Sequence, residues 1–130
     1  MPMKTYRELE VWQKAMDLVE ATYRLTKIFP VDERFGLASQ SQRAAVSVPA
    51  NIAEGYGRDH RKEYLRHLTI ARGSLMELET HLTIAVRLGY LTREKTLPAW
   101  DLTQQVGRML TKLIAALKSP PKPQPLNPNP

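Results

Sequence analysis

The segment from Phe35 to Arg58 carries the side chains in this sequence that are best suited to chemistry. Polar residues recur within it at steps of three or four: Arg43, Ser47, Asn51 and Glu54. Residues at this spacing lie on one side of a helix, and the next predicted helix adds the carboxylates of Glu77 and Glu79. Carboxylates beside an arginine can perform acid–base or phosphate chemistry, so one interpretation is a pocket lined by these side chains.

The alternative is a structural network between two helices, and we favour it. Arg43 would then pair with Glu77 or Glu79 across the helix interface. Removing one partner of a buried pair costs about 3–5 kcal/mol because the other charge is left uncompensated. Replacement of Arg43 by alanine is therefore expected to destabilise the fold strongly.

Pro49 lies inside the same helical pattern. A proline in a helix interior removes a backbone donor and clashes with the preceding turn, at a cost of roughly 3 kcal/mol. We expect the side chains of Ser47 and Asn51 to satisfy the backbone groups that Pro49 leaves unpaired.

A third interpretation is a hydrolase that uses the carboxylates of Glu54 and Glu77, and we disfavour it. Such a site would need a metal cluster, a nucleophile with a histidine or a Gly-rich phosphate loop, and the sequence shows none of these. The histidines have no spacing typical of a metal site and are expected at the surface or its boundary: His60, His67 and His81. No catalytic residue, metal, cofactor or small-molecule substrate is expected.

Basic residues surround the sequence Gly55-Tyr56-Gly57, where two predicted helices meet. If this corner contacts nucleic acid, four side chains would meet phosphates: Arg58, Arg61, Lys62 and Arg66. Tyr56 or Tyr64 could then stack on a base. The alternative is an ordinary helix corner whose charges are solvated.

Apolar residues at helical spacing predict four helices joined by short connections. They run over about Leu9 to Ile28, about Glu33 to Tyr56, from after Asp59 to Leu88, and from Thr92 to about residue 118. Gly55 and Gly57 are expected to close the second helix, Asp59 to cap the third, Gly89 to end it and Thr92 to cap the fourth. Pro98 predicts a kink or a second start near Ala99.

The predicted fold is all-α, an up-down-up-down antiparallel four-helix bundle over residues 1–118. Residues 119–130 read SPPKPQPLNPNP, which predicts a disordered, proline-rich tail. The net charge of +6 suggests a polyanionic partner, and residues 91–130 hold six basic and two acidic groups. There is no cysteine, no long apolar run and no signal-peptide pattern, so a cytoplasmic protein without membrane contact is expected.

Three ordered motifs resemble the bacterial 23S ribosomal RNA intervening-sequence proteins, a family of four-helix bundles. They are YRELEVW over Tyr6–Trp12, FPVDERFGLASQSQRAAVSVPANIAEGYGR over Phe29–Arg58, and GSLMELE over Gly73–Glu79. Together with the helices between them, they extend the resemblance over about residues 5–118.

The resemblance implies a homopentamer and a link to nucleic acid, by analogy with the accessory variability determinant proteins of diversity-generating retroelements. We therefore expect a non-enzymatic oligomeric scaffold that binds RNA or DNA through basic surfaces with little sequence preference. The alternative is a structural or adaptor protein whose partner is another protein, with no nucleic-acid binding.

Overall fold

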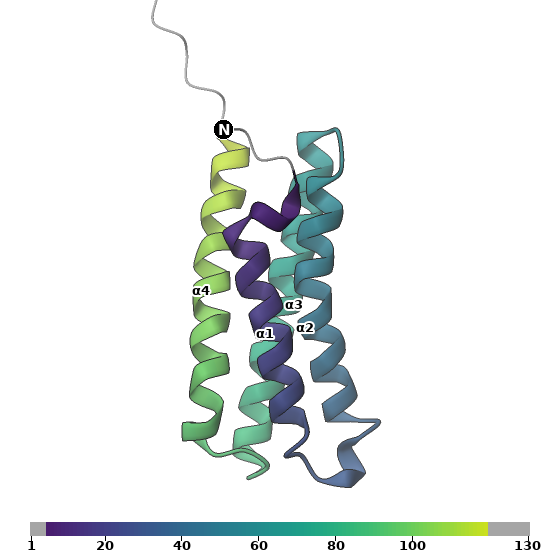
Figure 1. Cartoon of the computed structure of the whole chain (residues 1–130), viewed down its shortest axis with the longest axis vertical. Helices are drawn as coiled ribbons and strands as arrows, with labels where there is room; N and C mark the ends of the chain where they lie inside the picture. The colour runs from purple at the N-terminus through teal and green to yellow at the C-terminus, as the bar shows by residue number, and fades with distance from the viewer. Residues whose placement is uncertain (1–4, 120–130) are drawn as a thin grey trace, which may run out of the picture.

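The computed structural model describes residues 5–119, and within them the chain forms an antiparallel four-helix bundle (Figure 1). The helices are α1 (Glu10–Thr26), α2 (Leu37–Tyr56), α3 (Arg61–Arg87) and α4 (Arg93–Lys118). Two short 3-10 turns, η1 (Tyr6–Glu8) and η2 (Val31–Glu33), precede α1 and α2. The predicted fold class is confirmed, whereas the predicted tail from residue 120 onward lies outside the described residues.

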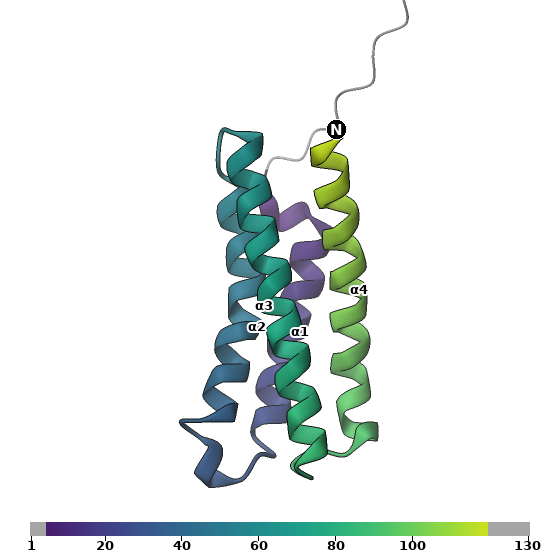
Figure 2. The same ribbon diagram turned by 180° about the vertical axis from the view of Figure 1, so that it is seen from behind.

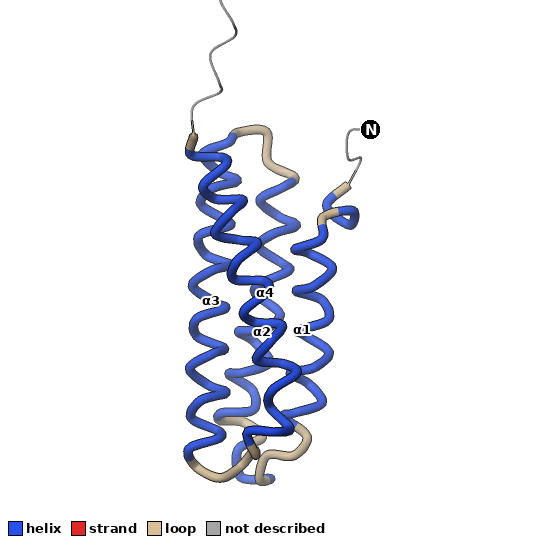
Figure 3. The backbone as a smooth tube through the Cα atoms, turned by 90° about the vertical axis from the view of Figure 1, so that its left-hand side faces the viewer, coloured by secondary structure: helices blue, strands red, loops and turns tan. Residues whose placement is uncertain are grey.

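Each helix packs against its neighbour in the sequence, and α1 also packs against α4, which closes the bundle. Successive helices run in opposite directions, as the views from front and back show (Figures 1 and 2). Over the described residues the tube view contains helices and loops without a strand (Figure 3). No helix of this part of the chain is both long and apolar enough to cross a membrane.

Leucines and other aliphatic residues from all four helices fill the core. The largest wholly buried ones are Leu18, Val48, Ile52, Leu68, Leu75, Leu78, Leu82, Val106 and Leu110. They come from the apolar face of each helix, so burial of that face rather than helix propensity supplies most of the stabilisation.

Neither proline inside a helix interrupts it. The predicted second start near Ala99 is wrong, because α4 runs without interruption from Arg93 to Lys118. Pro98 is exposed, as is Glu94, whose carbonyl loses its helical donor and faces water instead. Pro49, by contrast, is buried within α2 and packs in the core.

Two predicted helix-end residues need correction and three are confirmed. Gly57 closes α2 as predicted, in a right-handed conformation with φ −76°, whereas Gly55 lies inside the helix. The residue that precedes α3 as its N-cap is His60, not Asp59, and its side chain makes no capping bond. Gly89 has φ +79° at the end of α3, and the Thr92 hydroxyl accepts a hydrogen bond from the Lys95 amide at 3.2 Å, both as predicted.

Gly55 sets the distance between α2 and α3. A Cβ atom at this position would lie 2.7 Å from the Cβ of His67 and 3.0 Å from Cδ1 of Tyr64. Both contacts belong to α3, and the first is with an atom fixed to the backbone rather than with the far end of a flexible side chain. Only a glycine therefore allows the two helices to approach this closely.

Substitution of Gly55 by alanine should lower the free energy of unfolding by about 1–3 kcal/mol, because the added methyl group forces α2 and α3 apart. Gly73 is the matched control, since it also lies inside a helix but a Cβ there would meet nothing within 4 Å. Gly73→Ala should stabilise the protein by up to about 1 kcal/mol through helix propensity. Chemical denaturation measures both changes, and equal effects of the two substitutions would contradict the close-approach role of Gly55.

Candidate functional site

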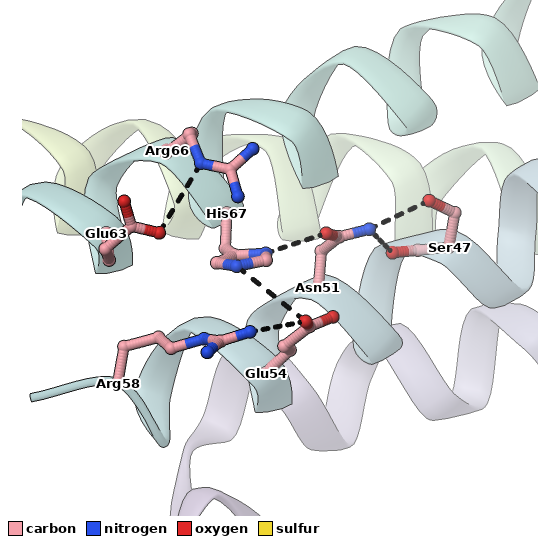
Figure 4. A network of polar contacts seen from close by, with 7 residues as sticks. All are labelled: Ser47, Asn51, Glu54, Arg58, Glu63, Arg66 and His67. Atoms are coloured by element: carbon pink, nitrogen blue, oxygen red, sulfur yellow. Dashed lines mark hydrogen bonds and ion pairs between the residues drawn. The ribbon is translucent and has the colours of Figure 1, made fainter.

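Asn51 is the centre of a polar network that joins α2 to α3 (Figure 4). Its Nδ2 donates to the backbone carbonyl of Ser47 at 2.9 Å and to the Ser47 hydroxyl at 3.0 Å. Its Oδ1 lies 3.1 Å from Nδ1 of His67 on α3. Because a carbonyl only accepts, the bond to Ser47 fixes which end of the amide carries the nitrogen.

The same orientation fixes the tautomer of His67. An amide oxygen only accepts, so Nδ1 of His67 must carry the proton that it shares with Asn51. In the neutral ring, Nε2 is then an acceptor. It is buried without a hydrogen-bond partner, and the atom that faces it is Oε1 of Glu54 at 3.9 Å (Figure 4).

The network extends from Asn51 in two directions. On one side, the hydroxyls of Ser47 and Ser74 lie 2.8 Å apart and form a second link between α2 and α3. On the other side, Glu54 accepts from Nη2 of Arg58 at 2.9 Å, and both of these side chains are about half exposed. The contacts therefore lead from the helix interface at Ser74 to solvent at Arg58.

Arg43, Glu77 and Glu79 do not join this network, which corrects the predicted pairing. Arg43 is exposed and forms no ion pair with any described residue. Glu77 lies 3.7 Å from His81 one turn along α3, and Glu79 accepts from Gln104 of α4 at 3.0 Å. Helical periodicity predicts which side chains share one side of a helix. It does not predict which of them lies within ion-pair distance of a side chain on another helix.

The expected compensation for Pro49 also takes a different form. The carbonyl that loses its helical donor is that of Ala45, four residues before Pro49. The Asn51 amide bonds the carbonyl of Ser47 instead, and the Ser47 hydroxyl bonds Ser74. These two side chains therefore hold α2 against α3 rather than repair the turn around Pro49.

Two histidines expected at the surface are buried. His67 is 4% exposed and His81 is 7% exposed, whereas His60 is exposed. His67, Ser74 and His81 are spaced by seven residues, the heptad interval of a helix seam, and this was the available signal for placing them against α2. Each of the two buried rings has one nitrogen without a hydrogen-bond partner, Nε2 of His67 and Nδ1 of His81.

The enclosure of His67 determines what the network can do. General acid–base catalysis requires the ring nitrogen to reach a substrate, and Nε2 of His67 has almost no accessible surface. Among residues 5–119, no group of three or more histidine, cysteine or acidic side chains could hold a metal ion. The geometry fits a structural link between helices.

The four basic residues predicted at the α2–α3 corner are exposed, but they differ in their partners. Arg58 pairs with Glu54, and Arg66 pairs with Glu63 at 3.5 Å. Arg61 and Lys62 lie in the first turn of α3 and form no ion pair with any described residue. The cations at this corner that are open to an external anion are therefore Arg61 and Lys62.

Tyr56 and Tyr64 pack on each other beside these residues. Their rings meet edge to face with centroids 6.0 Å apart, and both are half-buried. Burial, with a smaller effect of Tyr56, raises the pKa of Tyr64 above its usual value. A base could stack on them only by displacing part of this contact.

Comparisons with known proteins identify a family and a fold. The family model described as 23S rRNA-intervening sequence protein matches residues 7–112. Among solved structures, the chain is similar to a protein of unknown function from the S23 ribosomal protein family of Bacteroides thetaiotaomicron, with 25% identity and a TM-score of 0.75. The alignment covers 80% of this chain and 97% of that chain. No curated protein matches the chain.

Replacement of Asn51 by alanine should lower the free energy of unfolding by about 1–3 kcal/mol, since it leaves the buried Nδ1–H of His67 unpaired. Arg43→Ala is the matched control on the same helix and should change stability by less than about 0.5 kcal/mol, because Arg43 is exposed. Thermal melting compares the two variants. A larger loss for Arg43→Ala than for Asn51→Ala would restore the buried-pair interpretation.

Proposed function

This chain belongs to the 23S rRNA-intervening sequence protein family, and we propose that it is a non-enzymatic, oligomeric scaffold that binds RNA or DNA in the cytoplasm. Binding occurs through basic surfaces and shows little sequence preference. The family's description supports association with RNA, and no group of three or more histidine, cysteine or acidic side chains among the described residues could hold a metal ion. Specificity for a base sequence would need side chains that read base edges in a groove, and the sequence contains no such motif.

The observation that carries this proposal is that Arg61 and Lys62 are exposed and have no ion-pair partner among the described residues. Both are exposed at the start of α3, and neither is neutralised by a described carboxylate. A helix N-terminus adds the positive end of its dipole to their charge. Phosphate groups are the partners that such a surface binds, with Arg58 and Arg66 as further contacts once their carboxylates are displaced.

A protein partner is the second candidate, and one feature favours it. Phe35 is 89% exposed and Val31 is 84% exposed in the connection between α1 and α2. Large apolar side chains this accessible occur at protein–protein contact sites. They lie at the opposite end of the bundle from Arg61, so an adaptor function would use a different surface (Figure 1).

The proposed assembly is a homopentamer. Tyr6 and Trp12 do not supply the contact between copies, because their ring centroids lie 5.3 Å apart and both side chains pack against the core. The apolar residues that are exposed on the helical faces are others, including Met76 on α3 and Leu97 on α4, at 57% and 56%. Five copies would also multiply the charge of +6 and strengthen anion binding.

Light scattering coupled to size-exclusion chromatography should therefore report a mass near five times 14.8 kDa at micromolar concentration. Apolar burial between copies stabilises the assembly, so it should persist at high salt. A monomeric mass at these concentrations would remove the oligomeric part of the proposal.

The double substitution Arg61→Glu and Lys62→Glu should reduce retention of RNA and DNA by at least tenfold in filter binding at low salt, because it reverses the free charge at the corner. Helicity should be unchanged, since acids are favoured in the first turn of a helix. Arg93→Glu with Lys95→Glu is the matched control: these exposed residues occupy the first turn of α4 at the other end of the bundle. Wild-type retention by the first variant would exclude the corner as the binding surface.

A further inference from the structure

The C-terminal half of α4 carries basic residues and no acidic residue that would balance their charge. Between Leu102 and Lys118 it carries Arg108, Lys112 and Lys118, and it contains no acidic residue. The helix dipole favours cations only in the last turn, which accounts for Lys118. Arg108 and Lys112 lie further from the C-terminal end of α4, so the helix dipole does not account for their charge.

A groove of about 620 Å³ between α3 and α4 brings these two residues together with a third cation. Arg72 lines it from α3, opposite Arg108 and Lys112. None of the three forms an ion pair with any described residue. Glu79 also lines the groove, and its carboxylate is engaged by the Gln104 amide at 3.0 Å.

Three unneutralised cations around one groove repel one another. Arg108 and Lys112 are four residues apart on one helix, a spacing at which like charges destabilise it. Arg72 is half-buried, so solvent screens its charge less than that of an exposed side chain. An anion held between them would relieve this repulsion.

The groove lies on the same side of α3 as Arg61 of the α2–α3 corner. Arg61 precedes Arg72 by eleven residues, which is three helical turns and about 16.5 Å along α3. The two side chains therefore lie on the same side of the helix. Figure 2 shows α3 and α4 beside each other on this side of the bundle. Arg61 and the groove lined by Arg72, Arg108 and Lys112 form a basic track along this side of the bundle.

We propose that this track binds the phosphodiester backbone of a single nucleic-acid strand, with Arg72, Arg108 and Lys112 as its principal contacts. The inference rests on the proposed nucleic-acid function and adds a second surface to the corner of Arg61 and Lys62. A strand suits the site better than a small anion, because Arg61 lies about 16.5 Å along α3 from Arg72, a span that successive phosphates of one strand can follow. The apolar side chains of Leu75 and Met76 line the same groove and offer a surface to sugars and bases.

The test uses fluorescein-labelled 20-nucleotide oligo-U and oligo-dT with the full chain, titrated from 50 to 300 mM salt. Substitution of Arg72, Arg108 and Lys112 by glutamine should lower the slope of log affinity against log salt by about 2, since each phosphate contact on a single strand contributes about 0.7. At 0.1 M salt that corresponds to a loss of about a hundredfold. Equal losses for both probes indicate backbone contact, and a loss confined to oligo-U would overturn a purely phosphodiester site.

The matched control replaces Arg24, Lys27 and Arg87 by glutamine. These residues are exposed at the other end of the bundle, and the change in net charge is the same. The control should retain the wild-type slope, and an equal fall in both variants would overturn the groove in favour of net charge. If the triple groove variant does not fold, the exposed pair Arg108→Gln and Lys112→Gln should still lower the slope by about 1.4.

The possible results distinguish a failure of the groove proposal from a failure of the proposed function. Binding by the wild type with an unchanged slope in the groove variant overturns the groove and leaves the function standing. Absence of binding by the wild type at 50 mM salt overturns both. Dissociation of the oligomer in the groove variant would identify the groove as a contact between copies and would also overturn the inference.

Discussion

The close contact of α2 with α3 at Gly55 is the constraint on which the rest of the structure depends. Only a hydrogen atom fits between the Gly55 backbone and the Cβ of His67, and this closeness brings the ring of His67 to Asn51 and the hydroxyl of Ser74 to Ser47. Interhelical hydrogen bonds of side chains this short require backbones at close range. The polar network is therefore a product of the glycine and not an independent feature.

This dependence decides between the two interpretations of the polar stripe. A catalytic pocket needs polar groups that face a space, whereas the Asn51 amide bonds Ser47 and Nδ1 of His67, and Nε2 of His67 is buried. Polar groups buried in this way give a helix pair one preferred register, because any shift leaves them unpaired. The binding surfaces that we propose lie on the outside, where cations without ion-pair partners are found among the described residues.

The number of helices, their directions and most of their core could be predicted from the sequence, because apolar periodicity reports directly on burial. Leu68, Leu78 and Leu110 are examples of residues whose spacing sufficed. The partner of Arg43 could not be predicted, because it depends on how two helices are rotated about their axes. The burial of His67 could not be predicted from its residue type, because a histidine is buried only where a partner such as Asn51 pairs with it. The nucleic-acid site assigned to the corner remains a prediction.

The enclosed proton of His67 has a consequence for observing this protein in solution. Because Nδ1–H lies between two helices and is shared with Asn51, it can exchange with water only when α2 and α3 separate. The exchange rate of this proton, followed through its imidazole resonance, therefore reports how often α2 and α3 separate, without an added label. Whatever ligand or assembly clamps the bundle will slow that exchange, even when it binds far from the histidine.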